Sequence, residues 1–247
     1  MAQPLDTNLH HARAYAWLKA MLIDYRFRPG EHLRIANLAS RLNVSATPVR
    51  ESLIRLQEES LVDAVPGRGF YAKTLNLREM LDLHELRFFV AKHAIERHID
   101  IANLSIIHVP QQQRDTSRRN GDHAAGAISQ DLVYARVKDQ AEYVEKIYDR
   151  IASISKNRTM TVLARNANER THYVRTIDME TTARLKEIVR NVEEVLSALQ
   201  SRDASGAIAI LERELQSQLD VMPDVVREGL GRACGSRQSE VAASSRC

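Results

Sequence analysis

The chain has few of the residues that mark several large classes of protein. Among its 247 residues there are two cysteines, Cys234 and Cys247, and both lie in the polar C-terminal stretch. That number and position exclude a disulfide framework and a zinc-finger spacing. No apolar run approaches the roughly 18 residues of a membrane span, and the N-terminus lacks the apolar core of a signal peptide. We therefore expect a cytoplasmic protein that does not associate with a membrane.

Aromatic residues and net charge are also low. Aromatics make up 5% of the chain, whereas the hydrophobic share of 44% is ordinary for a globular protein. The formal net charge is +3, but residues 1–75 carry ten Lys and Arg against seven Asp and Glu, while residues 76–247 carry 25 of each. The whole basic excess therefore lies in the N-terminal third, where it favours a polyanionic partner. The length leaves room for a small and a larger domain.

Residues 43–56 have the pattern of a turn followed by an amphipathic helix. Ser45 is suited to cap the helix because its hydroxyl can accept a hydrogen bond from a backbone N–H of the first turn. Pro48 falls in that turn, where its missing N–H costs little. A buried stripe at helical spacing is predicted for Val49, Leu53 and Leu56. Off this stripe lie Thr47, Arg50 and Ile54. Taken alone, the stretch is equally compatible with an ordinary surface helix.

The flanking segments favour a DNA-binding unit. Before the stretch, residues 33–42 form a short helical pattern, and Asn43 follows as a residue that tolerates a left-handed turn. After it, residues 61–65, the turn 66–69 and residues 70–73 predict a strand, a tight turn and a strand. This order is typical of a helix-turn-helix followed by a two-stranded wing with Arg68 at its tip. The N-terminal pattern 10–26 predicts a further helix that supports the recognition helix.

These segments together resemble the winged-helix domain of GntR-family bacterial transcription regulators. The resemblance runs from about Tyr15 to Lys73, and the stretches that carry it are 29–33, 38–39, 44–53, 55–62 and 67–70. A helix that enters the major groove presents its N-terminal residues to base edges and phosphates. Arg50 matches a DNA-contacting position of the family and is the first candidate. The remaining candidates are Ser45, Thr47, Arg34, Arg68 and Gly69.

The chain departs from the family pattern at two positions on this surface. Several members carry an arginine where this chain has Ala46, and FadR-like members carry another where it has Ala36. An arginine at these positions would contact guanine or phosphate through two hydrogen bonds. The departure implies a different operator sequence rather than loss of DNA binding, because Arg50, Arg68 and the helix N-terminus remain.

Beyond residue 76 the pattern is helical throughout. The predicted helices are 77–101, about 104–120, about 123–138, 140–156, 158–176, 179–201 and 204–228. Asp203 is the expected cap of the last helix. The predicted fold is therefore mostly α: a winged helix-turn-helix domain at 10–75 and an all-α helical bundle at 76–229. A flexible arm is expected at 1–9 and a disordered Gly/Ser/Arg-rich tail at 230–247.

The helical part resembles the FCD-type effector domain of the FadR subgroup. The segments that carry this resemblance are 83–87, 147–151 with 155–157, and 192–203 with Ala207 and Leu211. Many FCD domains bind a divalent metal through one aspartate and three histidines. The family pattern places these positions at Val144, Tyr148, Val192 and Glu214. Valine cannot ligate a metal, and such sites need several convergent nitrogen, oxygen or sulfur donors. We therefore expect no metal and no other cofactor.

An effector cavity can persist without the metal. Tyr148 and Glu214 would then project into the bundle core, where a lone carboxylate needs a partner. The candidates to reach it are Arg87, Arg165, Asn166, Arg170 and His172. We hypothesise that this cluster binds a small organic effector directly, and its arginines favour an anion. The competing interpretation is that each residue is solvated or satisfied within the core.

The resemblance implies a ligand-responsive regulator, most often a repressor in this family, that binds a palindromic double-stranded operator as a homodimer. One alternative is an enzyme in the C-terminal part, although the chain has no metalloprotease spacing, phosphate-binding Gly-rich loop or nucleophile elbow. We therefore do not expect an enzyme. The other alternative is a DNA-binding or interaction module that responds to no ligand. The ligand-responsive regulator and the module that responds to no ligand differ in whether a small molecule changes the affinity for DNA.

Overall fold

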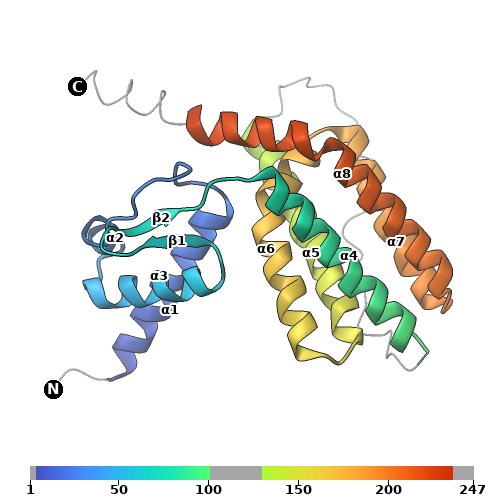
Figure 1. Cartoon of the computed structure of the whole chain (residues 1–247), viewed down its shortest axis with the longest axis horizontal. Helices are drawn as coiled ribbons and strands as arrows, with labels where there is room; N and C mark the ends of the chain where they lie inside the picture. Colours follow the sequence, from blue (N-terminus) through green and yellow to red (C-terminus); the bar gives the residue numbers. More distant parts are fainter. Residues whose placement is uncertain (1–3, 101–129, 236–247) are drawn as a thin grey trace, which may run out of the picture. The chain divides into compact units, whose positions relative to one another are not determined.

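The computed structural model describes residues 4–100 and 130–235 (Figure 1). Within these ranges the chain forms eight helices and one two-stranded antiparallel sheet. Packing divides the described residues into two compact units. The first is formed by residues 4–81, 169–174 and 222–235, and the second by residues 82–100, 130–168 and 175–221. The prediction of a mostly α fold with an N-terminal winged helix-turn-helix is confirmed.

The N-terminal part of the first unit is built around α1 (Pro4–Ile23), α2 (Ile35–Leu42) and α3 (Ala46–Glu58). The predicted stripe of α3 is fully buried, as are Ala14 and Leu18 of α1, which pack against it in one apolar core. Asn43 ends α2 in the left-handed conformation, with φ 53° and ψ 50°. The predicted helix-turn-helix and its supporting helix are therefore present.

The wing consists of β1 (Val62–Val65) and β2 (Gly69–Ala72). The strands are antiparallel, with Val62 opposite Ala72 and Val65 opposite Gly69. Gly67 and Gly69 both have positive φ angles, 71° and 101°, which the tight turn requires. The segment before α2 pairs with the far side of β2, since the backbone N–H of Leu33 donates to the carbonyl of Phe70 at 2.8 Å.

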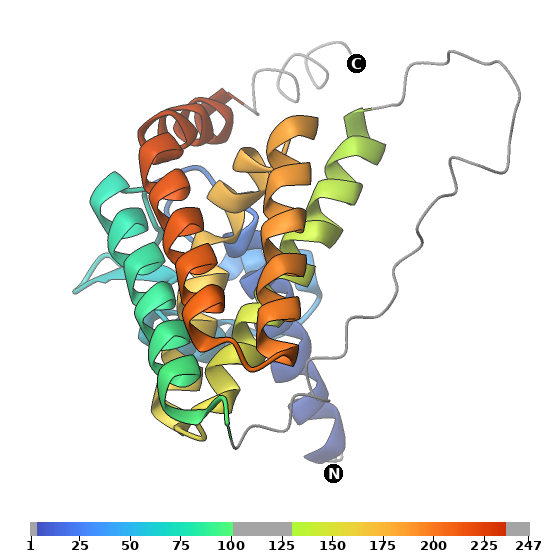
Figure 2. The ribbon, with the colours of Figure 1, turned by 90° about the vertical axis from the view of Figure 1, so that its right-hand side faces the viewer.

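The second unit is a helical bundle (Figure 2). Its helices come from α4 (Leu77–His98), α5 (Gln130–Ile154), α6 (Arg158–Asp178), α7 (Thr182–Gln200) and α8 (Ala204–Gly235). Side-chain caps fix three of the helix starts: Asn157 accepts from Met160 N, Thr181 from Arg184 N, and Asp203 from Gly206 N. The cap predicted at Asp203 is therefore confirmed, with an N···O distance of 2.8 Å.

Three expectations about helix limits are corrected. The helix α1 begins at Pro4, so the predicted arm 1–9 is too long; proline suits a first helical turn. The helix α5 runs unbroken through residues 138–140, because Val137, Ala141 and Val144 continue one buried stripe across them. The predicted helix 104–120 and the start of the helix 123–138 lie outside the described residues.

The end of α8 is the third correction. It continues to Gly235, so the predicted disordered tail does not begin at residue 230. Val226 and Ala233 are buried, and the hydroxyl of Tyr173 donates to the carbonyl of Gly229 at 3.2 Å. This burial offsets the low helix propensity of the glycines in the segment.

Five helices are followed by a residue other than glycine in the left-handed conformation. These residues are Tyr25, Asn43, Ser60, Lys156 and Arg202, with φ between 50° and 59°. At four of these ends the next residue donates its N–H back into the last helical turn: Arg26 to Met21, Val44 to Ala39, Leu61 to Leu56 and Asp203 to Ala198. Such bonds satisfy carbonyl groups that the end of a helix would otherwise leave without a donor.

Candidate DNA-binding surface and effector site

The recognition helix α3 buries one face and exposes the other. Its buried residues are Pro48, Val49, Ser52, Leu53 and Leu56. The exposed residues recur at Thr47, Arg50 and Ile54, and Ile54 keeps 44% of its surface exposed. The free face of the helix thus presents a hydroxyl, a guanidinium and an aliphatic group at helical spacing.

All six predicted DNA-binding residues are exposed on the winged-helix part of the chain. Arg50 and Gly69 line a groove of about 440 Å³ between α3 and the wing. Ser45 and Thr47 line a second groove at the start of α3. Arg34 precedes α2, and Arg68 lies in the wing turn, where its backbone N–H donates to the carbonyl of Val65 at 2.9 Å. The arrangement can therefore present three cations, Arg34, Arg50 and Arg68, and a helix N-terminus to phosphate groups.

The expected role of Ser45 as a helix cap is corrected. Ser45 occupies the cap position with extended dihedrals, φ −70° and ψ 169°, but its side chain makes no capping hydrogen bond. The hydroxyl instead lies exposed at the mouth of the groove at the start of α3. It is therefore available to an external partner.

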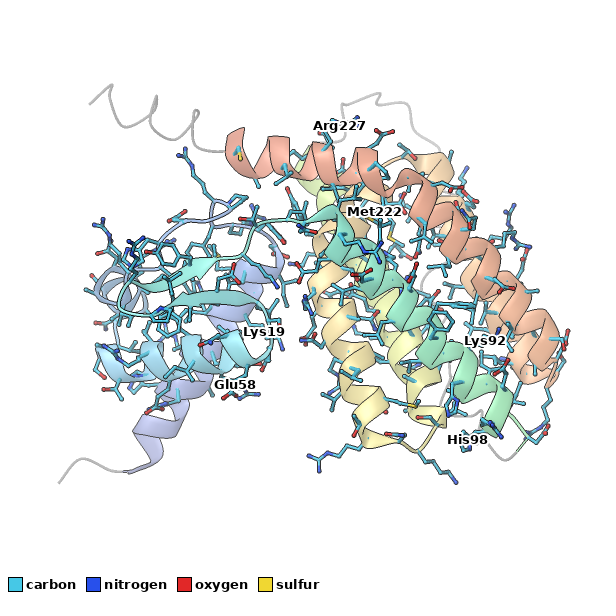
Figure 3. The ribbon with its side chains drawn as sticks, viewed as in Figure 1. Lys19, Glu58, Lys92, His98, Met222 and Arg227 are labelled. Atoms are coloured by element: carbon cyan, nitrogen blue, oxygen red, sulfur yellow. The ribbon has the colours of Figure 1, made fainter. Side chains whose placement is uncertain are left out.

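A polar clamp orients α3 against α1. The hydroxyl of Tyr15 donates to both carboxylate oxygens of Glu59, at 2.6 and 2.8 Å, and Lys19 Nζ donates to Glu59 Oε2 at 2.9 Å. Figure 3 labels Lys19 on α1. The guanidinium of Arg55 lies 3.9 Å from the centre of the Tyr15 ring. Partial burial acts to raise the pKa of Glu59, but the hydrogen bonds from Tyr15 and Lys19 outweigh it and lower that pKa.

The core of the bundle contains a connected polar cluster. Glu214 of α8 is buried and accepts hydrogen bonds from Arg184 Nη2 at 3.1 Å, Asn191 Nδ2 at 2.5 Å and Gln218 Nε2 at 2.9 Å. The amide oxygen of Gln218 in turn accepts from Arg87 Nη2 of α4 at 2.8 Å. One chain of hydrogen bonds therefore links α4, α7 and α8.

Arg87 is the least paired charge in this cluster. Its side chain is buried, and its guanidinium lies 4.1 Å from the centre of the Tyr148 ring on α5. Its Nη1 atom has no hydrogen-bond partner among the described residues. Burial, followed by the nearby Arg175, lowers the pKa of Arg87 to about 10, so the guanidinium stays charged at neutral pH. Burial likewise raises the pKa of Tyr148, which keeps its hydroxyl protonated.

A small cavity adjoins the cluster, and it contains all four positions at which the family pattern predicts metal ligands. Val144, Tyr148, Val192 and Glu214 line it together. The cavity measures about 10 Å³ as space for the centre of a water molecule, which is room for about one water. Hydrocarbon occupies two of the four positions, and both oxygens of Glu214 already accept hydrogen bonds. The residues present do not fit a divalent metal.

The structure brings together some of the predicted effector residues and not others. Tyr148 and Glu214 project into the core as expected, and Arg87 joins them. Arg165 instead is 61% exposed and pairs with Asp149 at 3.4 Å. Arg170 pairs with Glu79, and His172 Nε2 lies 3.7 Å from Asp24 Oδ1. Neither of them lines the core cavity, nor does Asn166. Their positions on α6 direct them to other partners.

Sequence reasoning missed three members of the cluster. These are Arg184 and Asn191 of α7 and Gln218 of α8. Gln218 lies four residues after Glu214, a spacing that places both on one helix face, so periodicity alone predicts that they are neighbours. No comparable local signal connects α7 to them.

A winged helix-turn-helix with an exposed arginine on its recognition helix, followed in the chain by a helical bundle with a polar core cavity, defines a DNA-binding transcription regulator. Residues 11–72 match the family described as bacterial regulatory proteins, gntR family, and residues 82–217 match the FCD domain. The FCD match covers more than half of the chain. The protein belongs to the GntR family and carries an FCD domain.

Known proteins similar to this chain agree with that assignment. It is 27% identical over 207 residues to the Nta operon transcriptional regulator of Aminobacter aminovorans, which covers 84% of this chain and 91% of that protein. It is 37% identical over 73 residues to the HTH-type transcriptional repressor GlaR of Escherichia coli, covering 30% of this chain and 33% of that protein.

A solved structure shares the fold. A GntR regulator from Rhodococcus sp. RHA1, described as putative, aligns with a TM-score of 0.63 and 18% identity, over 87% of this chain and 97% of that one. In the described parts of the chain, no helix combines the length and apolarity that crossing a bilayer requires.

Proposed function

We propose that the protein is a ligand-responsive repressor that binds a palindromic operator as a homodimer in the bacterial cytoplasm. The observation that carries the proposal is the exposed face of α3, where Arg50 lines a groove shared with the wing. A groove of this kind accommodates a DNA backbone while the helix N-terminus approaches base edges. The name of the relative GlaR, which matches the DNA-binding part, supports repression rather than activation.

The proposal of a homodimer follows from the size of one recognition surface. A single α3 reads a few base pairs, and the basic side chains Arg34, Arg50 and Arg68 neutralise few phosphates. Two copies related by two-fold symmetry double the number of base pairs that are read and of phosphates that are neutralised. They also match two half-sites about one helical turn apart. An insertion of five base pairs between the half-sites would turn one half-site to the opposite face of the duplex and should abolish cooperative binding.

The proposed effector site is the core cavity lined by Tyr148, Glu214 and Gln218, with Arg87 hydrogen-bonded to Gln218 behind it. Support comes from the buried guanidinium of Arg87 and from the cavity itself. We propose that the effector binds without a metal, because two of the family's ligand positions are valines. Binding changes operator affinity to the extent that the effector prefers one conformation of the protein over another.

The test is fluorescence anisotropy of the full-length protein on DNA from upstream of its own gene. Arg50→Ala should weaken operator binding by about 1–3 kcal/mol. Arg190→Ala is the matched control, since Arg190 is an exposed arginine of α7 and its removal causes the same charge change away from the winged helix. Equal affinities of wild type and Arg50→Ala at fixed salt would refute the assignment of Arg50. Weak, sequence-independent binding across a genomic DNA library would refute the repressor function.

A further inference from the structure

The buried arginines of the bundle differ in their partners. Arg184 forms ion pairs with Asp178 at 3.0 Å and Glu214 at 3.1 Å, and Arg175 forms one with Glu145. Arg87 has the neutral amide oxygen of Gln218 and the face of a tyrosine ring instead of a carboxylate. A buried cation is stable when it is paired and fully hydrogen-bonded. Arg87 is therefore an incomplete site with its remaining donor directed to no described group.

The surroundings of Arg87 restrict what can complete the site. Tyr148 and Gln218, the two residues that contact the guanidinium, also line the core cavity. The rest of the cavity wall is mostly aliphatic, and its two other polar members, Asn191 and Glu214, are hydrogen-bonded to each other. The aliphatic residues are Val144, Ile147, Ile151, Ile188, Val192, Val195, Ile210 and Leu211. A ligand that enters from the cavity thus meets hydrocarbon along its body and a cation behind the Gln218 amide.

We propose that this site takes a monocarboxylate with a branched or aromatic apolar body, and that its carboxylate replaces the Gln218 oxygen as the acceptor for Arg87. This proposal rests on the proposed function of the bundle as an effector domain and specifies the ligand class. A carboxylate can accept two charge-assisted hydrogen bonds from a guanidinium, which are about twice as strong as neutral ones. It therefore offers Arg87 more than the single bond from the amide does.

The same geometry disfavours other ligand classes. A cation would meet Arg87 directly, while Glu214 already accepts three hydrogen bonds within the protein. A dicarboxylate would place its second charge among the aliphatic side chains or beside the Glu214 carboxylate, whose donors Arg184 and Asn191 are already engaged. A ligand with a neutral amide would replace the Gln218 oxygen with another neutral acceptor for Arg87, so it would gain little binding free energy.

Binding requires the cavity to open, because its present volume holds about one water molecule. The side chain of Gln218 is the group that must move, since it bridges Arg87 and Glu214. Displacing it breaks the link between α4 and α8 and replaces it with a link through the ligand. The ligand thereby acts on the packing of two helices, which is the differential contact that an effector needs.

The experiment is isothermal titration calorimetry of the full-length protein in the presence of a metal chelator. The probes are 4-methylpentanoate and benzoate; the comparison compounds are 4-methylpentanamide, glutarate and isoamylamine. We expect at least one probe to bind at least tenfold more tightly than each comparison compound. Equal or tighter binding of glutarate or isoamylamine, or no binding of either probe, overturns the proposed class.

Two variants test whether the probe binds at Arg87, and a third serves as the control. Arg87→Met should abolish probe binding, and Arg165→Met, which removes an exposed arginine of the same unit, should leave it unchanged. Because Arg87→Met risks misfolding, Gln218→Ala serves as a second variant: it removes the amide oxygen that competes for Arg87, enlarges the cavity and adds no charge beside Glu214, so probe binding should become tighter. Probe binding that is unchanged or weaker in Gln218→Ala overturns the proposal.

Operator binding is measured separately, so the two proposals fail in different ways. Specific operator binding without any monocarboxylate binding leaves the DNA-binding function intact and overturns the ligand class. Monocarboxylate binding that requires Arg87, but leaves operator affinity unchanged, supports the ligand class and refutes the effector-responsive part of the proposed function. Glutarate binding that changes operator affinity supports the effector domain and overturns the class.

Discussion

Replacing Arg184 with methionine tests how the polar core of the bundle is held together. Arg184 Nε lies 3.0 and 3.2 Å from the two oxygens of Asp178, its Nη2 donates to Glu214 at 3.1 Å, and its Nη1 donates to Ser217 at 3.0 Å. The side chains of Asp178 and Glu214 are only 9% and 6% exposed. The variant therefore leaves two buried carboxylates without their shared cation.

Breaking a buried ion pair by removing one partner costs about 3–5 kcal/mol. For a unit of roughly 100–140 residues, each kcal/mol lowers the unfolding temperature by about 3–5 °C, so a shift of roughly 9–25 °C is expected. Replacing Asp178 and Glu214 by asparagine and glutamine in the same chain should recover most of the loss, because no buried charge then remains.

The pH dependence gives a second signature. Burial raises the pKa of Asp178 even with Arg184 beside it. An acid whose pKa is higher in the folded than in the unfolded protein is most stabilising below its unfolded pKa, and this contribution is lost as the pH rises through the folded pKa. Removing Arg184 should raise the pKa further, so Arg184→Met should lose more stability at pH 8 than at pH 5.

The assay is urea unfolding followed by circular dichroism at 222 nm. The single tryptophan, Trp17, packs on the core of the winged helix, so its fluorescence serves as an internal reference that should change little. Arg190→Met, which removes an exposed arginine of the same helix, is the control. A loss below about 1 kcal/mol, as for a surface ion pair, or a loss independent of pH, would refute the reasoning.

Three further predictions concern the winged helix, with Trp17 fluorescence as the readout. Glu59→Gln should destabilise the winged helix at pH 7. Because the pKa of Glu59 is lowered, the stability that its carboxylate contributes is present above its unfolded pKa and is lost as the pH falls through its folded pKa. The stabilities of the variant and the wild type should therefore converge in acid. Persistence of the difference in acid would contradict this. Gly69→Ala should cost about 1–3 kcal/mol of stability, since the φ of Gly69 is 101° and a Cβ would lie 3.0 Å from His32 Nε2. Gly67→Ala, where a Cβ would meet open space, should cost about 1 kcal/mol. Equal losses in the two variants would contradict the steric argument. Leu53→Ala, at a fully buried position, should cost about 2–5 kcal/mol, and a smaller loss would mean that α1 closes over the gap.

Local signals were sufficient to predict the winged helix. The spacing of Val49, Leu53 and Leu56 fixes which face of α3 is buried, and the glycines at 67 and 69 supply the positive φ angles of the wing turn. Each of these features depends on residues close together in the chain, so the sequence pattern and the fold agree. Asn43, at the turn of the helix-turn-helix, has the left-handed dihedrals expected of it.

The site in the bundle was predictable only in part, because its contacts join distant segments. Family resemblance placed Tyr148 and Glu214 in the core, but two of the three partners of Glu214 come from residues 23 and 30 positions away in α7. A periodic pattern cannot show which of several arginines faces inward: Arg87 does, whereas Arg165 lies at the surface. The end of α8 was missed because helix propensity underestimates the effect of burial at Val226 and Ala233.

The left-handed residues at the helix ends have a consequence for protein engineering. Tyr25, Ser60, Lys156 and Arg202 occupy a conformation that costs an L-residue about 1–2 kcal/mol, and that glycine adopts freely. Glycine's greater freedom in the unfolded chain returns about 0.4–1 kcal/mol of that gain. Tyr25 stacks on the ring of Tyr173 and Arg202 donates to the carbonyl of Ile99, so glycine would lose those contacts. The natural sequence thus leaves thermal stability unused at Ser60 and Lys156, two turns outside the recognition surface and the effector cavity, where glycine should raise the stability without changing either site.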